Sequence, residues 1–191
     1  MTDGYRDDIK NALKVLRDGG VILYPTDTVW GLGCDATRAE AVRRIYDIKK
    51  RADSKSLIVL VNSVTMLSRY VDNPPDIALE LSEMAEKPLT IVYDRGRGLA
   101  EGVTSDDGSV GVRICSDPFC DELLNAFRRP LVSTSANISG SEAPAIFDEI
   151  SEEIKAAVDY VCVWRQDDRS RAAASSVIKI SASGVIKILR P

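Results

Sequence analysis

Apolar residues along the chain fall into short blocks that follow either the helical or the strand period. Ile9, Ala12, Leu13 and Leu16 recur on one helix face, which predicts a helix that ends at glycines 19–20. Residues 21–24 are apolar and stop at Pro25, which predicts a short strand because proline cannot donate to a β-ladder. By the same criteria, further helices are expected over 37–49, 64–70, 77–84, 118–127 and 147–158, and further strands over 57–61, 89–93, 111–114, 130–134, 160–164, 177–180 and 185–189.

The order of these elements predicts the fold class. Helices and strands are interleaved, which is typical of an α/β protein with an open, twisted, mixed sheet and helices packed around it. The run at 57–61 has no polar residue, as expected of a strand that is covered on both faces. Thr37 and Glu40 have the spacing of a capping box, and Ser183–Gly184 predicts a final hairpin. With 191 residues and no evident linker, the chain is expected to form one domain over 1–191.

The composition and the N-terminal sequence predict in which cellular compartment the protein is found. Apolar residues make up 45% of the chain and charged residues 28%, as in globular domains. No apolar run approaches the ~20 residues that span a bilayer, and the N-terminus lacks the apolar core of a signal peptide. We therefore expect a soluble, cytoplasmic protein that does not enter membranes. The four cysteines are scattered without a CxxC pair, which predicts reduced thiols in or near the core.

The chain contains no histidine, and this absence excludes several kinds of chemistry. It rules out a Ser-His-Asp or Cys-His triad, an imidazole general base and the usual histidine-containing zinc site. No metal-ligating cluster is predicted. The net charge is −4 and the isoelectric point is near 5.0, so the overall field repels nucleic acid. Any anion site must therefore be a local cluster of lysine and arginine.

Three segments carry candidate chemistry. In the first, residues 24–33, Thr26 and Thr28 flank a carboxylate just after a strand, where they could approach a polar ligand or simply satisfy a turn. The same segment matches G-x-G-x-x-A from Gly31, but the strand ends too early for a dinucleotide fingerprint.

The second segment, residues 49–55, holds four cations at a helix end. They could complement the helix dipole in solvent, or Lys49 and Arg51 could hold phosphates.

The third segment is a predicted strand that opens into small polar residues at 133–140. Ligands bind at such strand ends in open α/β sheets, although serine and asparagine are also ordinary loop residues. Arg113 stands in another predicted strand, so it must either reach a cleft or pair with an acid. Ser175 and Arg190 lie near the ends of predicted strands, so for each of them the sequence leaves open whether it reaches a cleft or contacts a neighbouring side chain.

Taken together, these motifs closely resemble the YrdC family of threonylcarbamoyl-AMP synthases. The resemblance extends from about residue 18 to residue 191 and rests on the order of YPTDTVWGL at 24–32, Lys49-x-Arg51, Arg113, SANISG at 135–140, SSV at 175–177 and ILR at 188–190. It implies an α/β fold with an electropositive cleft. It also implies a nucleotidyltransferase that joins L-threonine, bicarbonate and ATP, with Mg²⁺ accompanying ATP, into threonylcarbamoyl-AMP and pyrophosphate for tRNA modification.

The resemblance also assigns roles to individual residues. Lys49 and Arg51 would be the catalytic cations, and the residues that bind substrate or nucleotide would be Thr26, Thr28, Trp30, Arg113, Ser135, Asn137, Ser175 and Arg190. Trp30 stands where the family often has tyrosine or phenylalanine, and we expect it to form a pocket wall against the threonine methyl group. A downstream threonylcarbamoyl transferase would take the product, and no extra C-terminal domain follows in this sequence.

Two other functions remain open from the sequence. An RNA-binding module of the same fold would need a broad basic surface and stacking aromatics, whereas only 6% of the residues are aromatic. Weak or no stable binding of tRNA is therefore expected. The second alternative is carbamoyl adenylation from carbamoyl phosphate, a role that usually belongs to a module within a longer chain.

Overall fold

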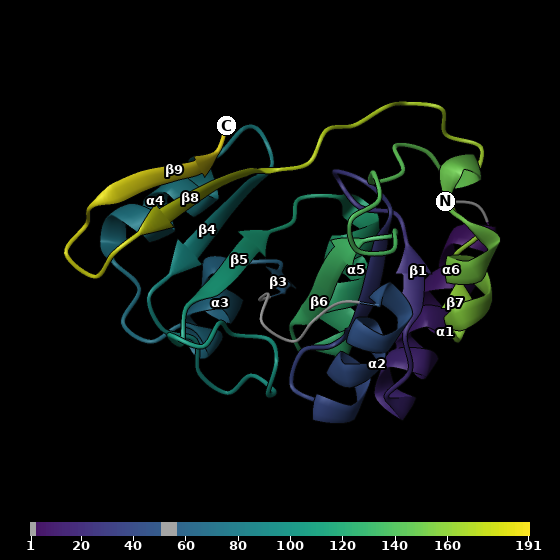
Figure 1. The fold of residues 1–191 in the computed structure, drawn as a ribbon, viewed down its shortest axis with the longest axis horizontal. Coiled ribbons are helices and arrows are strands. Elements are labelled where there is room, and N and C mark those ends of the chain that lie inside the picture. The colour runs from purple at the N-terminus through teal and green to yellow at the C-terminus, as the bar shows by residue number, and fades with distance from the viewer. Residues whose placement is uncertain (1–2, 51–56) are drawn as a thin grey trace.

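The structure, a computed structural model, describes residues 3–50 and 57–191. In this part of the chain, nine strands form one sheet in the order β7-β1-β2-β6-β3-β5-β4-β8-β9 (Figure 1). The strands are β1 (Ile22–Tyr24), β2 (Gly31–Asp35), β3 (Ile58–Val61), β4 (Leu89–Tyr93), β5 (Val110–Ile114), β6 (Leu131–Ser135), β7 (Tyr160–Val161), β8 (Ser176–Ile180) and β9 (Ile186–Arg190). Neighbours β1–β7, β3–β5 and β4–β8 are parallel and the other pairs are antiparallel, so the predicted open mixed sheet is confirmed.

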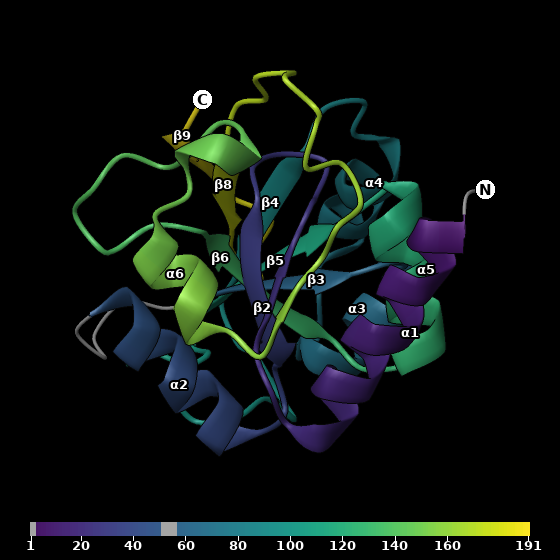
Figure 2. The same ribbon diagram turned by 90° about the vertical axis from the view of Figure 1, so that its right-hand side faces the viewer.

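Helices cover the sheet on both sides. They are α1 (Asp3–Asp18), α2 (Ala39–Lys49), α3 (Val64–Tyr70), α4 (Asp76–Met84), α5 (Pro118–Phe127) and α6 (Glu152–Ala157), with a 3₁₀ turn, η1 (Phe147–Glu149). Figure 2 shows α1 and α5 side by side on one side of the sheet, and α2 and α6 on the other. The central strand β3 is therefore buried almost throughout, as its uninterrupted apolar sequence predicts.

Local sequence signals set several element ends. Helix α1 is followed by Gly19 at φ +85°, a conformation that favours glycine at a helix C-terminus. Asp117 caps α5, because its carboxylate accepts hydrogen bonds from the backbone N–H groups of Phe119 and Cys120. Gly184, at φ +80°, turns the hairpin between β8 and β9.

Two local predictions are wrong. Thr37 does not cap α2; its hydroxyl and its N–H both donate to the Asp35 carboxylate, and the helix begins one residue later without a side-chain cap. The helix expected over 147–158 is divided into η1 and α6. Ile150 is extended between them, and Ser151 begins a new helix by capping the N–H of Ile154.

Strand β2 is the main difference in topology. No strand was predicted between residues 25 and 56, but Gly31–Asp35 form a buried strand between β1 and β6. A Cβ atom at Gly33 would lie 2.6 Å from Cε1 of Tyr24, so this strand packs closely because position 33 has no side chain. Gly31 and Gly33 are therefore residues of a buried strand, and they do not form the turn between a strand and a helix that a dinucleotide fingerprint requires.

Residues 162–175 cross the molecule from β7 at one edge of the sheet to β8 (Figure 1). Ion pairs fasten this crossing segment: Arg165 to Asp117 at 2.9 Å, Arg169 to Asp148 at 2.6 Å, and Arg171 to Glu149. The segment thereby brings residues 174–175 to the middle of the molecule.

All four cysteines are buried and free, as predicted. Burial raises the pKa of Cys34 and of Cys162 well above the usual thiol value, so both are neutral at pH 7. In the described part of the chain, no helix combines the length and the apolar character that a membrane span requires.

Candidate active site

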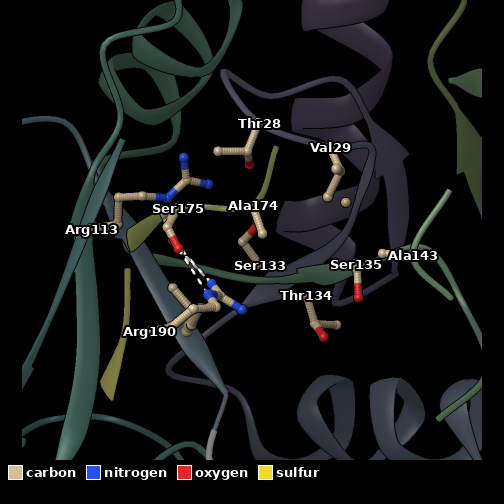
Figure 3. A pocket seen from close by; sticks show the side chains of 12 residues that line it. Thr28, Val29, Arg113, Ser133, Thr134, Ser135, Ala143, Ala174, Ser175 and Arg190 are labelled. Carbon is tan, nitrogen blue, oxygen red and sulfur yellow. Dashed lines mark hydrogen bonds between the residues drawn. The ribbon is translucent and has the colours of Figure 1, made fainter. Parts of the chain in front are cut away.

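A pocket of about 270 Å³ opens where the loop after β1, strand β6 and the β8–β9 hairpin meet. Figure 3 shows Arg113 and Arg190 on one side of this pocket and Thr134, Ser135 and Ala143 on the other. The described residues that line it are Thr28, Val29, Gly31, Ile58, Arg113, Ser133, Thr134, Ser135, Ala143, Ala174, Ser175 and Arg190. This lining contains two arginines and no carboxylate, and one of the two arginines, Arg113, is paired with Asp27 next to the lining.

Small residues on adjacent strands create the hollow. Gly31 on β2 pairs with Ser135 on β6, and two positions along the same face Gly33 pairs with Ser133. Ser133 in turn pairs with Ile58 on β3. A Cβ at Gly31 would lie 3.1 Å from Oγ of Ser133, so the glycine keeps the floor of the pocket open.

Arg113 is the buried cation of the pocket. Its side chain extends from strand β5, which pairs with the central strand β3, and only 4% of the residue is exposed. Its Nη1 pairs with the carboxylate of Asp27, so the arginine both reaches the pocket and pairs with an acid. Burial alone would lower the pKa of Arg113, but the Asp27 carboxylate raises it and the net shift is upward.

Arg190 and Ser175 are also part of the pocket lining, and they are hydrogen-bonded to each other. Nε and Nη2 of Arg190 donate to the carbonyl oxygen of Ser175, at 3.0 and 2.7 Å. The Ser175 hydroxyl lies 2.8 Å from that of Thr90 on β4. These contacts join β4, β8 and β9 at the pocket, and both predicted residues line it.

The two threonines of the loop between β1 and β2 have different positions. Thr28 lines the pocket, whereas Thr26 lies behind it and holds the loop. Oγ1 of Thr26 accepts from the N–H of Thr28 at 3.0 Å and lies 2.8 Å from the carbonyl oxygen of Val29. The two hydroxyls are 2.9 Å apart. Thr26 therefore shapes the loop that presents Thr28 and Val29.

Lys49, at the end of α2, fixes the loop after β6. Its Nζ donates to the carbonyl oxygens of Ser135 and Asn137, at 2.5 and 2.7 Å, and to Oδ1 of Asn137 at 3.3 Å. Oγ of Ser135 donates to the same Oδ1 at 2.5 Å, and Nδ2 of Asn137 donates to Ser141 O at 2.6 Å. Ser135 lines the pocket, while Lys49 and Asn137 lie outside its described lining. A direct contact of these two residues with nucleotide stays a prediction.

Trp30 and Arg51 are the remaining two of the predicted site residues. Trp30 was expected to form a wall of the pocket, but its buried indole packs on Phe147, with ring centroids 4.8 Å apart. It is absent from the described pocket lining, where Val29 is the apolar side chain next to Thr28. Trp30 precedes the first residue of β2 and lines a smaller hollow together with Thr26 and Thr28, so its contact with the threonine methyl group stays a prediction. The prediction for Arg51 lies outside the described residues.

The sequence missed two kinds of residue. Ile58, Ala143 and Ala174 line the pocket but carry no chemical signal, because their role depends on how distant segments meet. Arg165 was also missed. Its Nη1 donates to Thr26 O at 3.2 Å and to Oδ2 of Asp117 at 2.9 Å, so it braces the pocket loop from behind.

Fold and site together define an open-sheet α/β protein with a pocket lined by arginine and hydroxyl side chains. Comparison with known proteins shows to which family within this class the chain belongs. The family model Sua5_yciO_yrdC, described as "Telomere recombination", matches residues 14–191, and the chain belongs to this Sua5/YciO/YrdC family.

Individual relatives agree with this assignment. A threonylcarbamoyl-AMP synthase from Psychromonas ingrahamii is 33% identical over 153 residues, covering 78% of this chain and 80% of the relative. The structure of E. coli YciO has a TM-score of 0.79 at 26% identity and covers 97% of this chain and 89% of its own. P. abyssi Sua5 complexed with L-threonine also has a TM-score of 0.79, at 27% identity. That match covers 90% of this chain but only 50% of the longer Sua5 chain.

Proposed function

We propose that this chain is an L-threonylcarbamoyladenylate synthase that uses L-threonine, bicarbonate and ATP and serves threonylcarbamoyladenosine synthesis on tRNA. The observation that carries this proposal is the pocket lined by Arg113, Arg190 and the hydroxyls of Thr28, Ser135 and Ser175. Two cations and several hydroxyls suit a ligand that combines phosphates with a polar amino acid. The relatives named above support the choice of L-threonine, because one is named for the product and another was solved with the amino acid.

The reaction needs positioned cations more than a proton-transfer base. The threonine amine and bicarbonate form a carbamate with loss of water. A carbamate oxygen then attacks the α-phosphorus of ATP, the bond from this phosphorus to the β-phosphate oxygen breaks, and pyrophosphate leaves. Negative charge grows on phosphate oxygens in this step, and Arg113 and Arg190 would stabilise it. A chain without histidine can therefore perform this nucleotidyl transfer.

Mg²⁺ is expected to accompany ATP. No group of three or more cysteine, aspartate or glutamate residues within 3–50 and 57–191 could hold a metal ion. Within the described residues, Asp27 lies beside the pocket as the ion-pair partner of Arg113. Phosphate and water oxygens would therefore supply most ligands to Mg²⁺, whose role would be to neutralise charge on the leaving pyrophosphate.

Pyrophosphate release should depend on both the amino acid and bicarbonate. Serine lacks the methyl group of threonine, and one methyl in an apolar contact is worth about 1 to 3 kcal/mol, so threonine should be favoured roughly 10- to 200-fold in kcat/KM. The assay measures pyrophosphate with threonine, serine or no amino acid, each with bicarbonate or carbamoyl phosphate, and chromatography identifies the adenylate. Release that ignores the amino acid but requires carbamoyl phosphate would contradict the threonine assignment in favour of carbamoyl adenylation.

Binding of unmodified tRNA should be weak. The net charge of −4 gives the chain an overall field that repels RNA, and two of its arginines, Arg113 and Arg190, line one pocket. We expect dissociation constants within or above the non-specific range of ~10⁻⁴ to 10⁻⁶ M at physiological salt. A fluorescence titration over a salt series measures this. Submicromolar binding with a steep salt dependence would favour the RNA-binding alternative.

A further inference from the structure

Asp27 is an acid beside the pocket to which neither the motifs nor the resemblance assign a role. It stands between Thr26 and Thr28 in the loop from β1 to β2, and its side chain is 13% exposed. Oδ1 of this carboxylate pairs with Nη1 of Arg113, whose side chain is 5% exposed. An ion pair so sheltered from solvent is much less screened than the surface pairs of this protein.

Part of the Arg113 guanidinium makes no hydrogen bond with the residues that the structure describes. Its Nε is buried and has no hydrogen-bond partner among the residues that the structure describes. The neighbouring cross-strand residues are Leu60 on β3, which is apolar, and Thr90 on β4, whose hydroxyl is directed to Ser175. Within the described residues, the ion pair with Asp27 is therefore the charged contact that this guanidinium makes.

Asp27 is itself held on a rigid frame. The hydroxyl of Thr26 bonds to both Thr28 and Val29. Arg165 clamps the carbonyl oxygen of Thr26 to the Asp117 cap of α5, and Sγ of Cys120 lies 3.4 Å from Pro25 O. A carboxylate on so constrained a loop can hold an arginine in one orientation at little further entropic cost.

We propose that Asp27 is a positioning residue, which holds the Arg113 guanidinium in the orientation that faces the anionic part of the substrate. This inference rests on the proposed function only for the identity of the substrate. The test separates this role from its opposite: if Asp27 occupied Arg113 in place of the ligand's anion, its removal would tighten ATP binding. The two roles differ in the sign of the effect on ATP affinity.

The test is a double-mutant cycle with Asp27→Asn, Arg113→Gln and the double variant. Asparagine keeps the shape and one acceptor oxygen but loses the charge, and hydrogen bonds to neutral acceptors are roughly half as strong. Asp27→Asn should weaken ATP binding and lower kcat/KM about 10-fold each, and Asp27→Glu should recover part of the loss. In the Arg113→Gln background, Asp27→Asn should change either quantity less than about 2-fold, because a positioning residue acts only through its partner.

Asp18→Asn is the matched control, since Asp18 pairs with Lys14 on the exposed surface of α1. It should leave ATP affinity and kcat/KM unchanged.

Calorimetry of ATP binding keeps the test independent of the reaction, so failure of wild-type protein to form threonylcarbamoyl-AMP would count against the proposed function alone. If Asp27→Asn does not fold, Asp27→Glu carries the test, because it keeps the charge that pairs with Arg113 but displaces it, and it should still bind ATP more weakly than wild type; ATP affinity equal to that of wild type would then count against the inference. Tighter ATP binding in Asp27→Asn, or a further 10-fold loss in the double variant, would overturn the inference.

Discussion

Lys49→Ala is expected to lower threonylcarbamoyl-AMP formation by at least ~100-fold, because misplacement of a site by about 1 Å has effects of this size. Only 2% of Lys49 is exposed, and its ammonium holds the carbonyl oxygens of Ser135 and Asn137. Without the ammonium, these acceptors lose their partner and the loop moves at the pocket wall. Stability should fall by about 1–3 kcal/mol, the usual cost of unsatisfied buried groups. Pyrophosphate release and thermal melting, measured on the same samples, test both expectations.

Lys50→Ala provides the matched control for this variant. Lys50 is the next residue, but its side chain is 62% exposed and pairs with Glu153 on the surface. Alanine there removes the same charge from the same helix end, so a general contribution of positive charge to the helix dipole would affect both variants alike. We expect activity within about 2-fold of wild type for Lys50→Ala, as for other surface pairs. Equal activities of the two alanine variants would refute the role given to Lys49.

Gly31→Val is the second substitution with a large expected effect, and kcat/KM should fall ~100-fold or more. Gly31 is not among the glycines with positive φ, and valine suits a strand, so the backbone of β2 tolerates the change. The added side chain would start 3.1 Å from Oγ of Ser133 and 3.3 Å from Cε1 of Tyr24, and it would fill the pocket floor. Overpacking of this kind costs about 1–3 kcal/mol of stability. Equilibrium unfolding and ATP calorimetry separate lost binding from lost folding.

Gly4→Ala is the control for a glycine substitution as such. A Cβ at Gly4 in α1 meets no atom within 4 Å, and alanine favours a helix over glycine. Its kinetics should equal those of wild type. Wild-type kcat/KM in a folded Gly31→Val variant would show that the substrate does not use this floor, and the site would then have to lie elsewhere on the molecule.

Hydrophobic periodicity determined most of the elements and the fold class. The helices α2 to α5 and the strands β3, β4 and β5 lie within a residue or two of the ranges that the pattern predicts, because their signals are local: apolar spacing, a proline at N1 and a capping aspartate. The order of polar motifs along the chain likewise sufficed for the family resemblance. Thr28, Arg113, Ser135, Ser175 and Arg190 were expected at the site from that resemblance, and all five line the pocket.

Tertiary structure alone decided which of these residues face the pocket and which support it. β2 has few residues typical of strands, and its glycines became strand residues only because Tyr24 and β6 pack against them. The indole of Trp30 packs on Phe147, a contact between segments that are far apart in the sequence. The partners of Arg113 and Lys49 lie 86 and 86–88 residues away in sequence, respectively. Such contacts depend on chain topology and sheet register, which local spacing does not encode.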